Sequence, residues 1–314
     1  MAEVTLLLAA RERLLGDEVP AQLRFWTARG DRLADGPAGR DARLRNAFEF
    51  IGTSVPVAAL TRSLDAGDAA TALWLRADPA WVMADAVTLR LLACGDMHLS
   101  DADGAALARA LKPLFGDAGF PLEATTPSRW YLRCPPGAQL PVFSPPAAAL
   151  GDDIARHLPQ GDGGKRWQYL LNEAQVILHN HPLNAERARS GLAPVNSLWI
   201  WGGGTLPDWV RTNFTDVRSD DDVVHALSVR AKVDFRPLSE GLPGEFGGDT
   251  RMLIDLASLR DGAALERDWL QPLQQAVVEH KLEAVELQFG DGERYRYRHR
   301  HRWRVWRRIP PGRA

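Results

Sequence analysis

A chain of 314 residues with 45% hydrophobic and 25% charged residues has the composition of a folded globular protein. It is long enough for one large domain or for a core that carries an inserted lobe. The net charge is −2, although eight arginines fall between Arg294 and Arg308, so the positive charge is local. Cys94 and Cys134 have neither CxxC nor histidine-ligand spacing, which argues against a zinc ribbon or a disulfide framework and favours a reducing cytoplasm.

The first predicted element is a buried strand from Val4 to Ala10, a continuous apolar run of strand length. Glu3 stands where a signal peptide would carry positive charge, and the run is about half a bilayer span, so we expect no signal peptide and no membrane partner. The stretch "PAQLRFWTARG" predicts a helix that ends at Gly30. Residues 31–43 mix charge with Gly and Pro and predict a loop.

A compact ββαβ lobe is predicted next. Its strands are "TALWLRA" (71–77), "VTLRLLAC" (87–94) and "RWYLRC" (129–134), and its helix spans 101–115. Five prolines between Cys134 and Leu150 indicate a linker or crossover. We therefore expect residues 1–65 to form the first part of an α/β core, 66–149 an inserted lobe, and 150–314 the rest of the core.

The last part of the chain alternates strands with helices. Apolar residues at helical spacing predict a helix that the His181-Pro182 pair ends, and Val195 to Trp201 predicts a strand that runs into three glycines. Strand and helix follow in "FTDVRSDDDVVHALSVRA", then the buried strand "RMLIDLA", a helix interrupted at Pro272, and the strand "AVELQF". This order predicts an α/β fold with a mostly parallel sheet flanked by helices.

The densest group of polar residues suited to chemistry lies between Leu170 and Pro207. A strand that ends in Gly202, Gly203 and Gly204 leaves backbone N–H groups able to face an anion, although the glycines by themselves favour a tight turn. Arginine suits bidentate recognition of phosphate or carboxylate. We expect the glycines to form a ligand site together with five other residues: His179, His181, Asn184, Arg187 and Asn196.

Two further groups are weaker candidates. Arg76 and Asp78 share a strand face, where an ion pair in a turn is favoured over a ligand contact. Metal binding has four candidate ligands, none with a complete ligand set, and helix capping is the alternative for the last two: His179, His181, Asp221 and His225. The chain has no GxSxG elbow and neither cysteine lies in a reactive motif, so nucleophilic catalysis is poorly supported.

The stretch "NEAQVILHNHPLNAERARSGLAPVNSLWIWGGG" resembles the "HPxNxxR…G…N…W(L/I)WGxG" signature of bacterial cofactor-independent phosphoglycerate-mutase-like proteins, also called regulatory protein E of the pathogenicity-factor regulation (rpf) cluster. The similarity continues through "WLRADPAW", "LSDADGAALARAL", "RWYLRC" and "RWRVWRR". It implies a degenerate alkaline-phosphatase-like core. The residues that match the signature are His181, Asn184, Arg187, Asn196, Gly202 and Gly204.

Active members of the superfamily that this resemblance implies hold two divalent metals through aspartates and histidines and use a serine nucleophile. Here the first strand runs into Ala9-Ala10-Arg11, no Asp-His dipeptide occurs, and Asp255 is not followed by DxxxH. We therefore expect a non-catalytic regulatory protein, a pseudoenzyme without a cofactor, that binds a small phosphorylated or anionic ligand or a protein partner. The alternative is an active phosphomutase or phosphoesterase with unconventional manganese or zinc ligands.

The C-terminal "RYRYRHRHRWRV" places an arginine at every second position, as a half-buried strand requires. The loop "GDGE" joins it to "AVELQF", so residues 284–308 predict an antiparallel hairpin in which Glu286 and Glu293 neutralise part of the arginine ladder. Arginines along an exposed strand also oppose edge-to-edge aggregation. We favour this structural role over a nucleic-acid-binding arm, which remains a second alternative.

Overall fold

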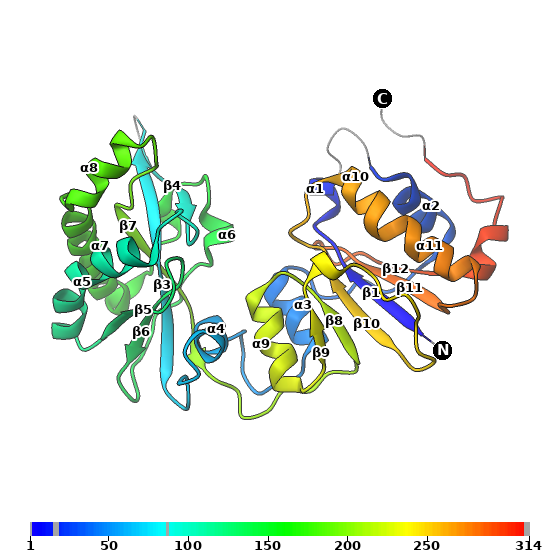
Figure 1. Ribbon diagram of the computed structural model, residues 1–314, viewed down its shortest axis with the longest axis horizontal. Coiled ribbons are helices and arrows are strands. Elements are labelled where there is room, and N and C mark those ends of the chain that lie inside the picture. Colours follow the sequence, from blue (N-terminus) through cyan, green and yellow to red (C-terminus); the bar gives the residue numbers. More distant parts are fainter. Residues whose placement is uncertain (1, 15–18, 86–87, 311–314) are drawn as a thin grey trace. The chain divides into compact units, whose positions relative to one another are not determined.

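The computed structural model describes residues 2–14, 19–85 and 88–310, and divides the chain into two compact units. Unit 1 comprises the described residues up to Ser54 and from Asp208 onward, and unit 2 is the insertion Val55–Pro207 (Figure 1). Unit 2 is longer than the predicted lobe of 66–149 at both ends, because residues 55–65 and 150–207, which we assigned to the core, cluster with it. The reason is long-range pairing, because the strand that we assigned to the core pairs within unit 2.

Unit 1 contains a seven-stranded sheet in the order β2-β12-β11-β1-β10-β8-β9. Its central strands run parallel, with β1 between β10 and β11 and with β8 and β9 following, while β12 and β2 are antiparallel. The mostly parallel sheet and the C-terminal antiparallel pair β11-β12 are thus confirmed. The strands are β1 (Glu3–Leu7), β2 (Asp31–Arg32), β8 (Asp216–Arg218), β9 (Asp234–Arg236), β10 (Arg251–Asp255), β11 (Ala284–Gln288) and β12 (Arg294–Arg298).

Helices flank this sheet. They are α1 (Arg11–Leu14), α2 (Ala21–Arg29), α3 (Arg40–Ala47), α9 (Asp222–Ala231), α10 (Gly262–Ala264) and α11 (Gln271–Val278), with a π-helical segment (Leu265–Leu270) before α11 and a 3-10 turn (Leu238–Glu240) after β9. One expectation for this unit was wrong in part: the predicted loop 31–43 contains β2 and the start of α3. The helix that we expected to be interrupted at Pro272 changes beside it from the π-helical segment, which ends at Leu270, to α11, which begins at Gln271.

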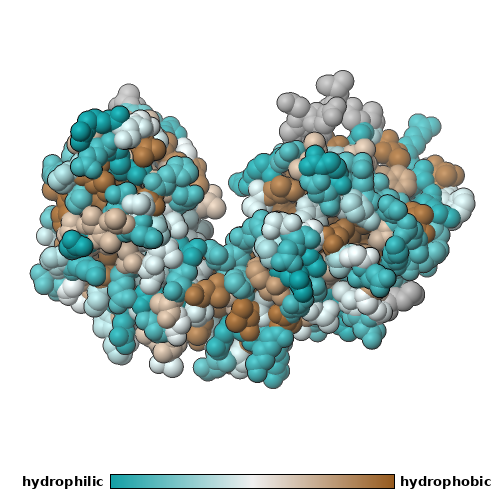
Figure 2. Space-filling view, in the orientation of Figure 1, coloured by the Kyte–Doolittle hydropathy of each residue, from teal (hydrophilic) through white to brown (hydrophobic). Residues whose placement is uncertain are grey.

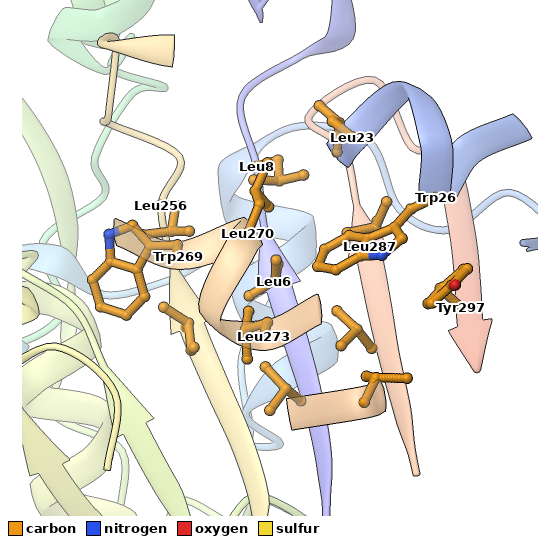
Figure 3. Close-up of a cluster of buried hydrophobic side chains, with 14 of the residues drawn as sticks. Leu6, Leu8, Leu23, Trp26, Leu256, Trp269, Leu270, Leu273, Leu287 and Tyr297 are labelled. Atoms are coloured by element: carbon orange, nitrogen blue, oxygen red, sulfur yellow. The ribbon is translucent and has the colours of Figure 1, made fainter. Parts of the chain in front are cut away.

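The core of unit 1 follows from the alternation of side chains along β1. Leu6 and Leu8 face one side of the sheet, where Trp26 of α2 and Leu273 of α11 cover them (Figure 3). These side chains are less than 3% exposed. Trp26 stacks on Tyr297 of β12 with ring centroids 5.8 Å apart, which joins the C-terminal hairpin to the same core.

Unit 2 contains an antiparallel sheet built on the long strand β3. The first part of β3 pairs with β6, which pairs in turn with β5; the last part pairs with β4, and β7 pairs with β3 along the opposite edge. The predicted ββαβ order is observed with one strand, β5, that we did not predict; Val87, part of the second predicted strand, lies outside the described residues. The elements are α4 (Val57–Asp65), β3 (Leu73–Ala84), β4 (Leu89–Cys94), α5 (Asp101–Asp117), β5 (Leu122–Ala124), β6 (Trp130–Cys134), α6 (Pro146–Ala149), a 3-10 turn (Ile154–Arg156), α7 (Gly161–His179), α8 (Pro182–Arg189) and β7 (Ser197–Thr205).

Helices α5 and α7 pack together against this sheet, with Leu107 and Leu111 of α5 and Leu170 and Leu178 of α7 in one buried cluster. Ser100 and Asp103 form a capping box at the start of α5. Both units present mostly hydrophilic surface in the view of Figure 2. In the described part of the chain, none of the helices combines the length and the apolar character needed to cross a bilayer.

Candidate functional site at the carboxyl edge of the parallel sheet

The carboxyl ends of the parallel strands in unit 1 meet at one edge of the sheet. The N–H of Leu256, just after β10, donates to the carbonyl oxygen of Leu7 at 2.9 Å, and the N–H of Leu8 donates to Gln288 of β11 at 2.9 Å. In open α/β sheets, ligands bind outside this edge, where the connections from neighbouring strands diverge. The edge is therefore the first place to look for a functional site in unit 1.

A guanidinium group bridges two carboxylates at this edge. Arg40, the first residue of α3, places Nη2 at 2.7 Å from Oδ2 of Asp221 and at 3.0 Å from Oδ2 of Asp255. The Asp255 side chain is 3% exposed, whereas those of Arg40 and Asp221 are 38% and 36% exposed. Burial opposes the charge on Arg40, but the negative charges of Asp255 and Asp221 outweigh it and raise the pKa of Arg40.

Ser219 and Asp221 connect this cluster to helix α9. The Ser219 hydroxyl lies 3.3 Å from Oδ2 of Asp255 and accepts the N–H of Asp221 at 3.0 Å. Oδ1 of Asp221 accepts the N–H groups of Val223 and Val224 at 2.8 and 3.1 Å, so this residue is the N-cap of α9. One oxygen of Asp221 thus satisfies the helix start while the other faces Arg40.

Arg43, one turn after Arg40, holds the ends of two strands together. Its Nη1 donates to the carbonyl oxygen of Leu8 at 2.7 Å and to that of Gln288 at 3.3 Å. Burial lowers the pKa of Arg43, although the charge of Asp255 acts in the opposite direction. We did not predict Arg40 or Arg43 as site residues, because residues 31–43 were interpreted as a loop. The signal was present in "RDAR", whose arginines stand three apart and share a helix face.

The donor set at this edge does not fit a two-metal centre. The carboxyl end of β1 and the residues just after it, Leu6 to Ala9, supply only apolar side chains, and both carboxylates already face Arg40. His225 stacks on Phe235, with ring centroids 4.2 Å apart, and the candidates His179 and His181 belong to unit 2. Within ranges 2–14, 19–85 and 88–310, no group of three or more His, Cys, Asp or Glu residues could hold a metal ion.

The three glycines of the predicted anion cradle lie inside strand β7, not in a loop after it. A Cβ atom on Gly202 would lie 2.9 Å from Cβ of Val57, and one on Gly204 would lie 2.5 Å from Cβ of Pro56. Gly202 also has a φ of +65°. The glycines therefore allow the start of α4 to pack directly on β7, because only a residue without a side chain fits there.

The polar residues of the HPLN signature hold backbone in place. Asn184 donates to the carbonyl oxygens of Leu178 and Val195 at 2.7 and 3.0 Å and accepts the N–H of Val195 at 2.9 Å. Arg187 donates to the carbonyl oxygens of Ala193 and Met97 at 2.8 and 2.6 Å. These bonds fasten the connection between α8 and β7 and leave both side chains at most 9% exposed.

The remaining signature residues also have structural partners. Asn196 pairs with the backbone of Val82 through two hydrogen bonds, of 2.9 and 2.8 Å. His181 is the N-cap of α8, where its Nδ1 accepts the N–H of Leu183. His179 is exposed at the end of α7. The structure thus brings most of the signature to one region of unit 2, the connection around α8 and β7.

Arg76 and Asp78 form a buried ion pair in the middle of the long strand β3, not in a turn. Nε and Nη2 of Arg76 lie 2.8 and 2.9 Å from the two carboxylate oxygens of Asp78, and the indole N–H of Trp201 donates to Asp78 at 2.8 Å. Asp78 is 2% exposed. The pair is bidentate and fully enclosed, so it joins β3 to β7 inside unit 2.

Comparisons with known proteins relate this chain to one group of enzymes. No protein-family model matches the chain. It is 34% identical over 199 residues to a protein of Geobacter sulfurreducens named probable 2,3-bisphosphoglycerate-independent phosphoglycerate mutase, covering 60% of this chain and 50% of that protein. It is 28% identical over 154 residues to the 2,3-bisphosphoglycerate-independent phosphoglycerate mutase of Methanosarcina mazei, covering 46% of this chain and 38% of that protein.

Among solved structures, the cofactor-independent phosphoglycerate mutase of Thermoplasma acidophilum is similar with a TM-score of 0.40 and 15% identity, covering 95% of this chain and 90% of the other. The chain spans at most half the length of the two curated relatives named above. The sequence matches confirm the resemblance to cofactor-independent phosphoglycerate mutases: over part of its length the chain is similar to proteins named 2,3-bisphosphoglycerate-independent phosphoglycerate mutase.

Proposed function

We propose that this phosphoglycerate-mutase relative is a regulatory binding protein without mutase turnover, and that a small hydroxylated anion, such as a phosphorylated metabolite, binds at the carboxyl edge of the unit 1 sheet. One observation carries the proposal: Arg40 lies between Asp221 and Asp255, with one of its nitrogens 2.7 and 3.0 Å from their oxygens. The protein's own side chain supplies the positive charge at this edge.

This arrangement disfavours metal-dependent phosphotransfer. A guanidinium group stays protonated at any physiological pH, so Arg40 cannot withdraw its charge to admit a second cation. A divalent ion would have to displace a hydrogen-bonded arginine, and among the described residues it would then have two nearby carboxylates and no group of three His, Cys, Asp or Glu ligands. The chemistry that remains at this edge is recognition through hydrogen bonds and charge.

The same arrangement favours an anion that also carries a hydroxyl group. In the described residues, Nε and Nη1 of Arg40 have no hydrogen-bond partner, and 38% of the side chain is exposed. Arg40 also opens helix α3, whose N-terminal N–H groups carry partial positive charge. Asp221, 36% exposed, can accept a hydrogen bond from a hydroxyl group of the same ligand. A phosphorylated hydroxy acid provides both groups.

Isothermal titration of the full chain with 3-phosphoglycerate, inorganic phosphate and glycerate tests the proposal. We expect 3-phosphoglycerate to bind more tightly than either fragment, and Arg40→Gln to abolish the binding. Arg45→Gln is the matched control, because Arg45 lies on the same helix and donates to the backbone of Gly52 and Thr53. Binding by none of these ligands, or equal loss in both variants, contradicts the site.

Turnover is tested separately. Elemental analysis of the purified protein and mutase and phosphatase assays with added manganese or zinc should give neither stoichiometric metal nor product. Metal retained at one or two ions per chain together with turnover would overturn the non-catalytic part of the proposal and support the alternative of an active phosphomutase or phosphoesterase.

A further inference from the structure

The end of the chain differs from the predicted strand. Strand β12 ends at Arg298, and residues His299–Trp303 form a 3-10 turn. One local and one distant contact accompany the break: the buried His301 accepts the N–H of Arg298 at 3.2 Å, and Arg304 donates to Asp31 at 2.6 Å. Alternation of arginines therefore describes a strand only up to Arg298, and the prediction for the rest of residues 284–308 was wrong.

Residues Arg300–Ile309, which we call the tail patch, expose large apolar side chains. Trp303 is 64% exposed, Val305 70%, Trp306 74% and Ile309 40%. Two tryptophans this exposed within four residues are unusual for a protein surface, where large aromatic side chains are normally covered. The patch therefore presents flat apolar rings to solvent.

The arginines of the patch are less neutralised than those of the strand before it. Arg294 and Arg296 in β12 pair with Glu286 at 2.7 and 2.9 Å, and Arg304 pairs with Asp31. Four others form no ion pair with any acid in the described part of the chain: Arg300, Arg302, Arg307 and Arg308.

Helix α2 adds two cations beside the same segment. Arg29 donates to the carbonyl oxygen of Arg302 at 2.5 Å, and Arg24 donates to that of Pro310 at 3.1 Å. Arg302 lies over the ring of Trp303, with its guanidinium carbon 4.6 Å from the ring centroid. Since the chain as a whole has a net charge of −2, this concentration of positive charge is a local feature.

We propose that the tail patch binds single-stranded nucleic acid, with bases stacked on Trp303 and Trp306 and phosphates held by the unpaired arginines. Rings and cations interleave along "RWRVWRR", as bases and phosphates do along a single strand. A lipid surface instead separates headgroup charge from apolar chains and favours a helix with segregated faces. A duplex keeps its base faces stacked inside and offers the tryptophans no ring.

Fluorescence anisotropy of the full chain with labelled oligothymidylate and oligouridylate of about 15 nucleotides, and with a duplex of equal length, tests the proposal. We expect single strands to bind more tightly than the duplex. The logarithm of affinity should fall against the logarithm of salt concentration with a slope of about −2 to −3, as about three to four contacted phosphates on a single strand require. Trp306→Ala and Trp303→Ala should each weaken binding about tenfold or more.

Variants separate stacking from charge and from folding. Trp306→Leu keeps an apolar side chain and should lose nearly as much affinity as Trp306→Ala, whereas Arg308→Gln should mainly reduce the salt slope. Arg267→Gln, an exposed arginine paired with Asp268, is the control and should bind normally. Thermal unfolding must match across the set. Binding to vesicles rich in phosphatidylserine without oligonucleotide binding, or binding that ignores both tryptophans, overturns the proposal.

Discussion

At the scale of single residues, Arg40 determines the chemistry of the unit 1 edge. Asp255 is 3% exposed, and a buried carboxylate is costly unless a cation or several hydrogen bonds compensate it. Arg40 supplies that cation from a position 215 residues away in the chain. The side chain that compensates the charge of Asp255 is thus also the side chain that we propose binds the ligand.

Removal of Arg40 should turn the edge into a weak site for a divalent cation. Arg40→Ala leaves Asp255 without its cation, and we expect a loss of about 1–3 kcal/mol in the free energy of unfolding. Added Mn²⁺ should restore part of this loss, because Asp221, Asp255 and water can then share the ion. Thermal unfolding with and without Mn²⁺ measures both effects.

Arg45→Ala is the control for that experiment and should respond to Mn²⁺ as the unaltered protein does. If Arg40→Ala is as stable as the unaltered chain, or if Mn²⁺ leaves its unfolding temperature unchanged, the bridging role assigned to Arg40 is wrong.

At the scale of elements, β7 shows why a correct local pattern led to a wrong site. The strand character of Val195 to Trp201 was predicted, but the glycines after it belong to the same strand and admit α4. A glycine whose N–H faces a ligand and a glycine that makes room for a neighbouring side chain cannot be told apart in a sequence. The position of Val57 against Gly202 identifies the second role here.

Gly202→Ala should destabilise unit 2 by about 1–3 kcal/mol, because the new Cβ would lie 2.9 Å from Cβ of Val57 and the backbone has a φ of +65°. In a Val57→Ala background the cost should fall without vanishing, since the backbone strain remains. Gly116→Ala in helix α5, where no atom lies within 4 Å, should be neutral or stabilising. Chemical denaturation of Gly202→Ala, Val57→Ala, the double variant and Gly116→Ala measures these effects. Equal effects of the two glycine substitutions would contradict this packing role.

The pair β11-β12 was predicted well because both strands are adjacent in sequence and alternate in polarity. Burial opposes the charge on Glu286, but hydrogen bonds from Arg294, Gln288 and Arg296 outweigh it and lower the pKa of Glu286 below its ordinary value. Glu293, the second acid expected to neutralise the ladder, pairs with Arg11. Strand β2 pairs with part of β12, so the arginine ladder does not form the free edge that we expected.

This lowered pKa predicts a pH dependence of stability. The ionised Glu286 stabilises the hairpin fully above its unfolded pKa of about 4.5, and this contribution is lost as the pH falls through the lower folded pKa. Glu286→Gln should therefore lower the free energy of unfolding at pH 7 and flatten its decline below pH 4.5. Urea denaturation between about pH 3 and 7 measures this; parallel pH profiles for the two proteins would contradict it.

At the scale of the whole molecule, the two units have separate cores and the insertion begins and ends at neighbouring points. In unit 2 a Cβ on Gly204 would lie 2.5 Å from Cβ of Pro56, so both ends of the insertion lie together. In unit 1 the N–H of Glu49 donates to Arg211 at 2.7 Å and the N–H of Arg211 donates back at 2.9 Å. Within each unit, the two chain segments that lead to the point of insertion therefore contact each other.

Each unit should fold without the other. Replacing Val55–Pro207 by a short Gly-Ser linker between Ser54 and Asp208 should leave a unit 1 that unfolds cooperatively and keeps the Arg40 site. The isolated segment Val55–Pro207 should also unfold cooperatively, but it should not bind 3-phosphoglycerate. Circular dichroism and calorimetry measure folding; an unfolded or aggregated product from either half would contradict the division.

The sequence by itself determined the local elements and the resemblance to cofactor-independent phosphoglycerate mutases, because hydrophobic periodicity and short motifs depend on residues close together in the chain. The α/β class, the helix before His181 and the hairpin through Arg298 were all predicted in this way. Tertiary structure alone decided that β7 pairs with β3 and that Arg40 meets Asp221 and Asp255. Such contacts join residues more than one hundred positions apart. A local sequence pattern does not identify the distant residue with which a strand or a charged side chain pairs.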